Sequence, residues 1–281
     1  MIARAPTLSA PAALVRRYDP DRFRFALFAP ARHREAVFTL FAFNHEVAKT
    51  RDSVSETMIG AIRLQWWRDS IDGIYAGTPR QHEVIGPLAA CIAAYDLPRA
   101  PFDDLINARE RDLEDRPMED LAETERYLRA TTAPLVTLLS AIVDPDGRTD
   151  RAALADIAAG HALIGRLRAA AFDESVRRPF LPRSVLTEHG AETRSFAELK
   201  ADAGARKAIK ALAEHAQILV RQGLHIPKRA GLAPLLLPAR QARARIRQLA
   251  ALDHDPFSPE FAAHDPLDVW RFWLARLTRR Y

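Results

Sequence analysis

Hydrophobic positions along most of the chain recur at the spacing of an α-helix. Between Ala31 and Arg51 apolar residues fall three or four positions apart, and the same spacing continues towards Gly77. The run Asp144-Pro145-Asp146-Gly147 is typical of a turn. Further helices are predicted over residues 83–95, 101–115, 120–143, 150–172, 196–223, 238–252 and 266–280. No run rich in Val, Ile and Thr alternates as a central strand would, so the pattern predicts an all-α fold of about ten helices.

Composition narrows the classes of protein that are possible. Of 281 residues, 48% are hydrophobic and 27% charged, which is typical of a globular protein rather than a disordered one. The net charge of +5 favours an anionic surface but is too small to indicate nucleic-acid binding. No apolar run approaches the ~20 residues of a membrane-spanning helix. The single cysteine, Cys91, lies in the apolar run LAACIAAY and is predicted to be buried in a protein of a reducing compartment.

The first 18 residues differ from the rest of the chain. They contain arginine and no acidic residue, and they lack the continuous apolar core of a secretory signal. We predict a flexible arm over residues 1–18 and one helical domain over residues 19–281.

Five segments, in order, resemble the squalene/phytoene synthase superfamily over nearly the whole chain. They read FALFAPARHREAVFTLFAFNHEVA, IRLQWWRDSIDGIY, LINARERDLEDRP, ERYLRATTAPL and LRAAAFDESVRRPFLP. The resemblance implies a single-domain, all-α isoprenoid synthase fold with its helices around a central cavity. It also implies a head-to-head prenyltransferase that condenses two prenyl diphosphates with Mg²⁺.

Such chemistry requires carboxylates, because Mg²⁺ must neutralise each leaving pyrophosphate and is bound through carboxylate oxygens and water. The family carries an aspartate motif on each of two helices. In the first, the sequence has Ala48 and Lys49 where two aspartates are expected, and only Asp52 remains. Lys49 also adds positive charge that opposes Mg²⁺ binding.

The second motif is reduced in the same way. Leu167-Arg168 is followed by Ala169 where the first aspartate is expected, and only Asp173 remains. One carboxylate per helix is poor ligation for Mg²⁺. The sequence therefore predicts no catalytic residues, no bound metal and no cofactor. Mg²⁺ is expected only under the alternative function, an active prenyltransferase.

Within the superfamily, residues 36–75 and 166–182 are similar to the mitochondrial assembly factor of respiratory complex I (NADH:ubiquinone oxidoreductase). The turn DSVSE replaces the first motif in that branch, and LRA followed by a basic stretch and FLP replaces the second. This resemblance implies a pseudoenzyme whose partners are complex I subunits or other assembly factors. It implies a peripheral place at the inner membrane, cytoplasmic in a bacterium and on the matrix side in a mitochondrion.

Other residues are weaker candidates for a site. Trp66 and Trp67 point about 100° apart on a helix, so at least one of them is predicted to be core. Arg240, Arg243 and Arg247 share one helix face and, with Arg276, Arg279 and Arg280, form either a basic patch for phospholipid or an acidic partner, or a solvated face. The candidates for lining a cavity are Phe43, His45, Trp66, His161 and Arg166.

Three functions remain open at this point. The leading hypothesis is a pseudoenzyme that assists complex I assembly and uses its cavity or outer surface to hold a partner or an isoprenoid lipid. The rival is a working prenyltransferase of the squalene or phytoene type. The third is a lipid-binding protein with no role in complex I.

Overall fold

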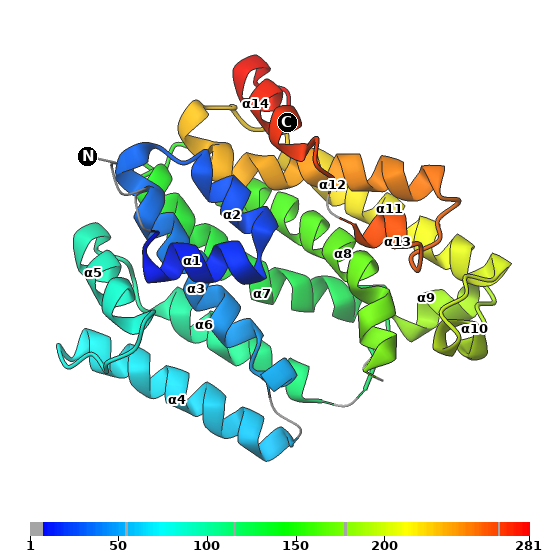
Figure 1. Cartoon of the computed structure of the whole chain (residues 1–281), viewed down its shortest axis with the longest axis horizontal. Helices are drawn as coiled ribbons and strands as arrows, with labels where there is room; N and C mark the ends of the chain where they lie inside the picture. Colours follow the sequence, from blue (N-terminus) through cyan, green and yellow to red (C-terminus); the bar gives the residue numbers. More distant parts are fainter. Residues whose placement is uncertain (1–7, 54–55, 115, 177–178, 264) are drawn as a thin grey trace, which may run out of the picture. The chain divides into compact units, whose positions relative to one another are not determined.

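The computed structural model describes residues 8–53, 56–114, 116–176, 179–263 and 265–281. Within these residues it contains fourteen α-helices, four 3₁₀ helices and no strand (Figure 1). The predicted all-α fold is therefore confirmed. The helix number exceeds ten partly because of short helices that periodicity does not reveal, namely α9 (Arg183–Glu188), α10 (Thr193–Ala197) and α13 (Pro259–Ala262).

The described residues group into two compact helical units. The first contains the described part of Met1–Leu113 with Pro134–Arg148 and Gly231–Pro234, and the second contains the described parts of Glu114–Ala133, Thr149–Ala230 and Leu235–Tyr281. Helix α7 (Leu121–Val143) contributes residues to both units.

The first unit begins with a helix rather than a flexible arm. In α1 (Ala10–Tyr18) the Ser9 side chain accepts a hydrogen bond from the Ala12 N–H, and Ala12 and Val15 are fully buried. The prediction of a flexible arm is wrong for these residues, because the burial of α1 against α3 (Arg34–Ala48) orders them. Residues 1–7 of the predicted arm lie outside the described residues.

An aromatic cluster forms the core of the first unit. The Phe43 ring, on α3, makes edge contacts with Trp67 on α4 (Thr57–Tyr75) and Phe102 on α6 (Ala100–Ala108), at centroid distances of 5.6 and 5.4 Å. Trp67 is 1% exposed, which confirms that one of the two adjacent tryptophans is core. Burial of this kind, worth about 25 cal/mol per Å² of apolar surface, stabilises the unit.

Cys91 lies on α5 (Ile85–Tyr95) of the first unit. The residue is buried, as predicted, and burial raises the pKa of its thiol to about 12. The thiol therefore stays protonated at neutral pH and behaves as a small apolar side chain. Helix α2 (Pro20–Leu27) completes the N-terminal part of this unit, with the Asp19 side chain accepting a hydrogen bond from the Arg22 N–H at its start.

The second unit is built on two long helices that lie side by side, α8 (Arg151–Ser175) and α11 (Ala203–Gly223) (Figure 1). Their close approach depends on glycine. A Cβ atom at Gly160 of α8 would lie 2.8 Å from the Ala216 carbonyl oxygen of α11, and a Cβ at Gly223 would collide with the Ala153 carbonyl. The pair provides the frame on which α12 (Ala233–Ala251) and α14 (Asp268–Thr278) complete the unit.

Two helix boundaries in the second unit differ from the predictions. Residues 196–223 do not form one helix, because the chain leaves the helical conformation at Leu199 (φ 54°) and restarts at Asp202, whose side chain accepts a hydrogen bond from the Ala205 N–H. Helix α12 begins at Ala233 rather than at Pro238. A proline near the start of a helix removes one backbone hydrogen bond, and burial of this segment offsets that loss.

Candidate functional site

The first motif lies where α3 ends. Ala48 is the last residue of the helix, and the Lys49 N–H donates to the His45 carbonyl oxygen at 2.9 Å to cap it. Asp52 follows in a short 3₁₀ helix (Arg51–Ser53) and is exposed. The three positions are thus at a helix end, and two of them carry no carboxylate.

The buried acidic group near this motif is Glu46, whose side chain is 4% exposed. The Lys49 ammonium donates a hydrogen bond to the Glu46 carboxylate, and an Arg63 guanidinium nitrogen from α4 lies 3.9 Å from its other oxygen. Two cations of the protein therefore surround one carboxylate. A carboxylate compensated in this way has no net charge left to attract a divalent ion.

The second motif, on α8, shows the same arrangement. Asp173 is 7% exposed, and its carboxylate accepts a hydrogen bond from the Arg166 guanidinium at 2.5 Å. The guanidinium also lies over the Phe180 ring, 4.2 Å from its centroid. Arg166 is therefore held on two sides, by an ion pair and by a cation–π contact, and supplies the positive charge that Asp173 needs when it is buried.

The residues at the two motifs do not fit Mg²⁺. Ala48, Lys49 and Ala169 offer no carboxylate where the family pattern expects one, and Asp173 is paired with a guanidinium. Across the part of the chain that the structure describes, no group of three or more His, Cys, Asp or Glu side chains is arranged to hold a metal ion. Mg²⁺ requires several oxygen ligands in octahedral geometry, which these positions do not supply.

The candidates for cavity lining in the first unit have protein neighbours. Phe43 belongs to the aromatic core and is fully buried. The His45 ring stacks on Tyr18 at 5.1 Å, and burial, together with Lys49, lowers its pKa. Trp66 is partly exposed, with the Arg80 guanidinium 5.5 Å from its ring centroid. Phe43 is therefore a packing residue, and His45 is neutral at pH 7.

The remaining cavity candidates, His161 and Arg166, lie on α8 in the second unit. The Nε2 atom of His161 is 2.8 Å from the Gln241 side-chain oxygen of α12, so this histidine has a hydrogen-bond partner. Arg166 has the two partners described above. Both residues contact protein groups: His161 joins α8 to α12 through Gln241, and Arg166 joins α8 to the following segment through the Phe180 ring.

The predicted basic residues lie on α12 and at the C-terminal end of α14. Arg243 and Arg247 are exposed, and Arg243 donates a hydrogen bond to the Tyr281 carbonyl oxygen at 2.7 Å. Burial lowers the pKa of Arg240, and the charges of Arg247, Arg271 and Arg243 lower it further. Arg240 therefore lies within the positive field of its neighbouring arginines.

A model of the squalene/phytoene synthase family matches residues 15–279 of the chain. The chain belongs to the squalene/phytoene synthase family. A solved dehydrosqualene synthase superposes on it with a TM-score of 0.82 at 15% identity, covering 96% of each chain. The isoprenoid synthase fold expected from the sequence is thereby confirmed.

Curated relatives divide into two kinds within the squalene/phytoene synthase family. The chain is 28% identical over 273 residues to NADH dehydrogenase (ubiquinone) complex I, assembly factor 6, of Bos taurus, which covers 95% of this chain and 81% of that protein. It is 25% identical over 170 residues to the phytoene synthase of Rhodobacter capsulatus, covering 59% of this chain and 49% of that protein. The similarity to the assembly factor is thus the more extensive of the two.

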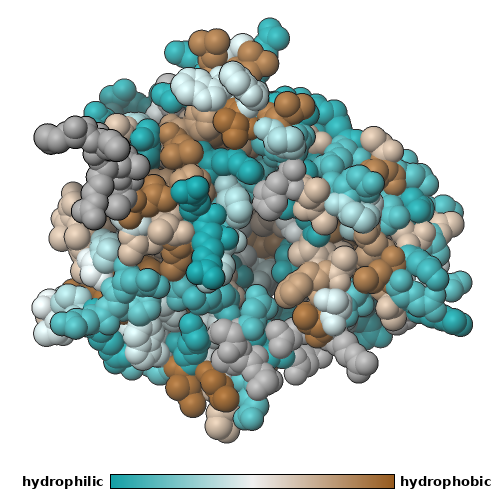
Figure 2. Space-filling model, viewed as in Figure 1, coloured by the Kyte–Doolittle hydropathy of each residue, from teal (hydrophilic) through white to brown (hydrophobic). Residues whose placement is uncertain are grey.

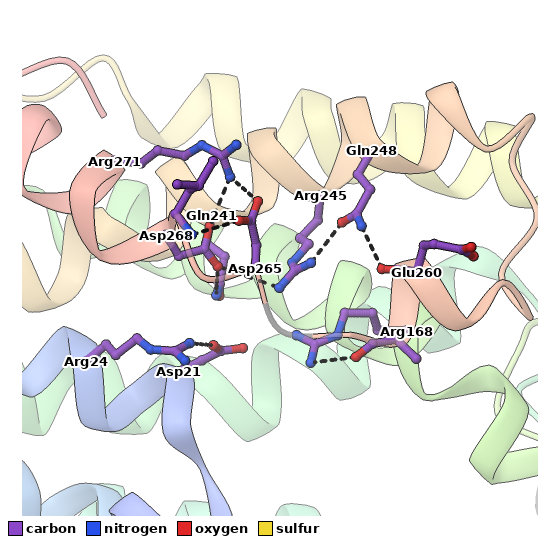
Figure 3. A network of polar contacts seen from close by, with 12 residues as sticks. Asp21, Arg24, Arg168, Gln241, Arg245, Gln248, Glu260, Asp265, Asp268 and Arg271 are labelled. Carbon is purple, nitrogen blue, oxygen red and sulfur yellow. Dashed lines mark hydrogen bonds and ion pairs between the residues drawn. The ribbon is translucent and has the colours of Figure 1, made fainter.

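A buried polar network, which the sequence pattern did not predict, lies between α12 and the segment that leads into α14 (Figure 3). Asp268, 1% exposed, lies 3.5 Å from the guanidinium groups of Arg245 and Arg271. The Arg271 guanidinium also pairs with Asp265. A polar cavity of about 310 Å³ opens beside these groups and is lined by Ala244, Arg245, Arg247, Gln248, Asp265, Asp268 and Arg271.

A sequence signal for part of this network exists. Gln241 and Arg245 are four residues apart on a helix whose other residues at this spacing are apolar, so they share one buried face. A polar pair on such a face predicts a buried partner of opposite charge. The identity of that partner, Asp268, depends on how α14 packs against α12.

Loss of the Asp173 carboxylate is expected to destabilise this family member. The Asp173→Asn substitution should lower the free energy of unfolding by about 1–2 kcal/mol, because it leaves the Arg166 guanidinium without its buried counter-charge. This value is below that of a fully buried pair, since the Arg166 side chain is 34% exposed and partly screened by solvent. Urea-induced unfolding measures the change.

The matched control for that substitution is the neighbouring Glu174. Burial raises the pKa of the Glu174 carboxyl group above its value in the unfolded chain. At pH values above the unfolded pKa, the charged carboxylate therefore lowers the free energy of unfolding. At lower pH the group is protonated in both states, and this loss of stability disappears. The Glu174→Gln substitution should therefore leave stability at pH 7 unchanged or slightly raised. Equal losses for the two variants would show that the Asp173–Arg166 pair has no special role.

Proposed function

We propose that this member of the squalene/phytoene synthase family is a non-catalytic protein that assists the assembly of respiratory complex I. The observation that carries the proposal is that protein cations lie beside the buried carboxylate at or next to each motif. Lys49 and Arg63 form ion pairs with Glu46, and Arg166 forms an ion pair with Asp173. The protein itself neutralises Asp173, the carboxylate that remains in the second motif and that a transferase would need for Mg²⁺, and it compensates Glu46, the buried acid beside the first motif, in the same way.

The assembly role is supported by the extent of similarity to curated relatives. The bovine protein named complex I assembly factor 6 matches 95% of this chain, and the human protein of the same name matches 90% at 28% identity. The rival function, an active head-to-head prenyltransferase, is supported by the partial match to a phytoene synthase. The loss of motif aspartates favours the assembly role over the transferase.

The proposed partners are complex I subunits or other assembly factors, and the proposed place is the inner face of the membrane that houses complex I. Among the described residues, no helix is both long enough and apolar enough to cross a bilayer. Association at the membrane surface would then require an exposed apolar or basic surface. The protein would need neither Mg²⁺ nor any other cofactor for this role.

Deletion of the gene tests the proposal in the organism that carries it. We expect NADH:ubiquinone oxidoreductase activity in membranes to fall at least severalfold, with partly assembled complex I on native gels. Expression of the wild-type chain should restore both. Unchanged activity and unchanged assembly after deletion would contradict the proposal.

Complementation with Asp52→Asn separates the assembly role from catalysis. Asp52 is an exposed carboxylate at the first motif, and asparagine keeps its shape without its charge. An assembly factor carrying this substitution should restore complex I fully. Failure of this variant to restore complex I when it is present at the wild-type level would support the transferase instead, because the variant removes the first motif's remaining aspartate.

A further inference from the structure

Helix α14 has one buried face and one exposed apolar face. Asp268, Phe272 and Ala275 are at most 2% exposed and lie on the buried side. The opposite side carries large apolar residues, which helices of globular proteins seldom expose together. These residues, with their exposed fractions, are Leu267 (55%), Val269 (42%), Trp270 (74%), Trp273 (58%), Leu274 (58%) and Leu277 (82%).

The exposed residues form a continuous stripe. At about 100° per residue, Trp270, Trp273, Leu274 and Leu277 fall within an arc of about 100° on the helix surface. Apolar side chains over α14 are visible at the top of the space-filling view, beside hydrophilic ones (Figure 2). We call this surface, made of the six residues given above, the α14 apolar face.

The orientation of α14 is determined by its buried side. Asp268 lies in the first turn and is close to Arg245 of α12, while Arg271 pairs with Asp265 (Figure 3). Phe272 is fully buried one turn further along. Because these contacts involve the opposite side of the helix, the apolar face is directed outward by packing and not by fraying of the chain end.

Positive charge lies at the end and the edge of the same helix. Arg279 and Arg280 follow α14 directly and are exposed, and Arg276 is partly exposed. Arg243 of α12 joins this group through its hydrogen bond to the Tyr281 carbonyl oxygen. A helix with tryptophan and leucine on one side and arginine beside them is typical of a segment that lies in the interface of an anionic bilayer.

The size of the apolar face argues against a second copy of the chain as its occupant. The face consists of six residues on and beside one helix of eleven residues, about 16 Å long, whereas each partner in a stable dimer contributes about 20–30 residues. Binding to a bilayer interface does not require a large complementary surface. Each apolar side chain that leaves water lowers the free energy of binding on its own. Anionic head groups also match the charge of the neighbouring arginines.

We infer that the α14 apolar face is the membrane-binding element of this protein and that it inserts into the interface of a bilayer containing anionic phospholipid. This inference deepens the proposed function, because it rests on the proposed peripheral place at the membrane. Trp270, Trp273, Leu274 and Leu277 enter the boundary between head groups and acyl chains. Arg279 and Arg280 contact the phosphate groups beside them.

Co-sedimentation of the full-length chain with vesicles tests the inference. The wild-type protein should bind phosphatidylcholine vesicles that contain phosphatidylglycerol, and the Trp270→Ser/Trp273→Ser variant should show a partition coefficient at least about tenfold lower. The Arg279→Gln/Arg280→Gln variant should lose about fivefold in affinity for each arginine on anionic vesicles and nothing on neutral ones. Vesicles with brominated acyl chains should quench wild-type tryptophan fluorescence.

The matched control removes exposed apolar residues elsewhere. Met58 and Ile62 on α4 are 73% and 63% exposed, so the Met58→Ser/Ile62→Ser variant loses comparable apolar surface in the first unit. Its vesicle binding should equal that of the wild type. Equal losses in the α4 and α14 variants would overturn the inference, as would wild-type protein that stays in the supernatant or that self-associates through Trp270 and Trp273.

Complementation distinguishes this inference from the proposed function. If the wild-type chain restores complex I but binds no vesicles, the inference is wrong and the assembly role stands. If it binds vesicles through α14 but deletion leaves complex I unchanged, the inference stands and the assembly role is wrong. If both hold, the Trp270→Ser/Trp273→Ser variant should fail to restore complex I at wild-type levels.

Discussion

Purified protein incubated with farnesyl or geranylgeranyl diphosphate and Mg²⁺ is expected to release pyrophosphate at least about a thousandfold more slowly than an active family member. Mg²⁺ contributes several kcal/mol to stabilising the charge that develops on a leaving pyrophosphate. Ala48, Lys49 and Ala169 cannot bind it, and Arg166 already neutralises Asp173. A dehydrosqualene synthase assayed in parallel supplies the reference rate, and product analysis by mass spectrometry detects condensation.

A variant with restored aspartates tests whether the missing carboxylates are the reason that Mg²⁺ does not bind. The Ala48→Asp/Lys49→Asp/Ala169→Asp chain recovers the carboxylates that the family pattern expects, and it removes the Lys49 cation beside Glu46. Its thermal unfolding midpoint should rise with added Mg²⁺, because binding to the folded state stabilises it. The wild-type midpoint should stay constant. Robust Mg²⁺-dependent pyrophosphate release by the wild-type chain would overturn the non-catalytic proposal.

The Asp268→Ala substitution is expected to lower the free energy of unfolding by about 3–5 kcal/mol. Asp268 is 1% exposed and Arg245 is 3% exposed, so the substitution leaves a guanidinium buried in the protein without its carboxylate neighbour. It also removes the Asp268 carboxylate from Arg271 and from the Gln241 side-chain amide. Chemical denaturation monitored by circular dichroism measures the loss.

The control for this substitution is Asp253→Asn, because Asp253 has a φ of 52°, which asparagine tolerates better than alanine. The Asp253 carboxylate lies 3.2 Å from the Arg206 guanidinium, but its side chain is 86% exposed. An exposed ion pair contributes little, so the loss should stay below about 1 kcal/mol. A similar loss for the two variants would mean that burial of the Asp268 network contributes nothing to stability. It would also mean that this network does not determine the orientation of α14.

Much of the fold followed from the sequence because helix periodicity is a local property. Residues 31–48, 57–75 and 151–175 each carry enough apolar positions at helical spacing to identify a buried face. The break at Leu199 was missed because a single residue with positive φ between two helical runs leaves no trace in periodicity. The N-terminal helix was missed because nine residues are too few to indicate helix without the neighbour that buries them.

The sequence predicted which carboxylates the candidate site lacks, but it did not predict all of the ion pairs that the remaining carboxylates form. The substitution of alanine and lysine for aspartates at positions 48, 49 and 169 is visible in the sequence. The pairing of Asp173 with Arg166 is partly visible, since residues seven apart on a helix share a face. The approach of Arg63 to Glu46 is not, because it joins two helices whose relative placement depends on the packing of Phe43 and Trp67.

The sequence by itself determined the helical class, the family and the absence of paired aspartates at both motif positions. Each of these depends on residue identity and on spacing along one helix. Only the tertiary structure decided which charges meet and which apolar residues stay exposed. Asp268 meets Arg245, and Trp270 and Trp273 face solvent, because burial of Phe272 sets the rotation of α14 against its neighbours. That rotation depends on packing between helices, which local periodicity does not specify.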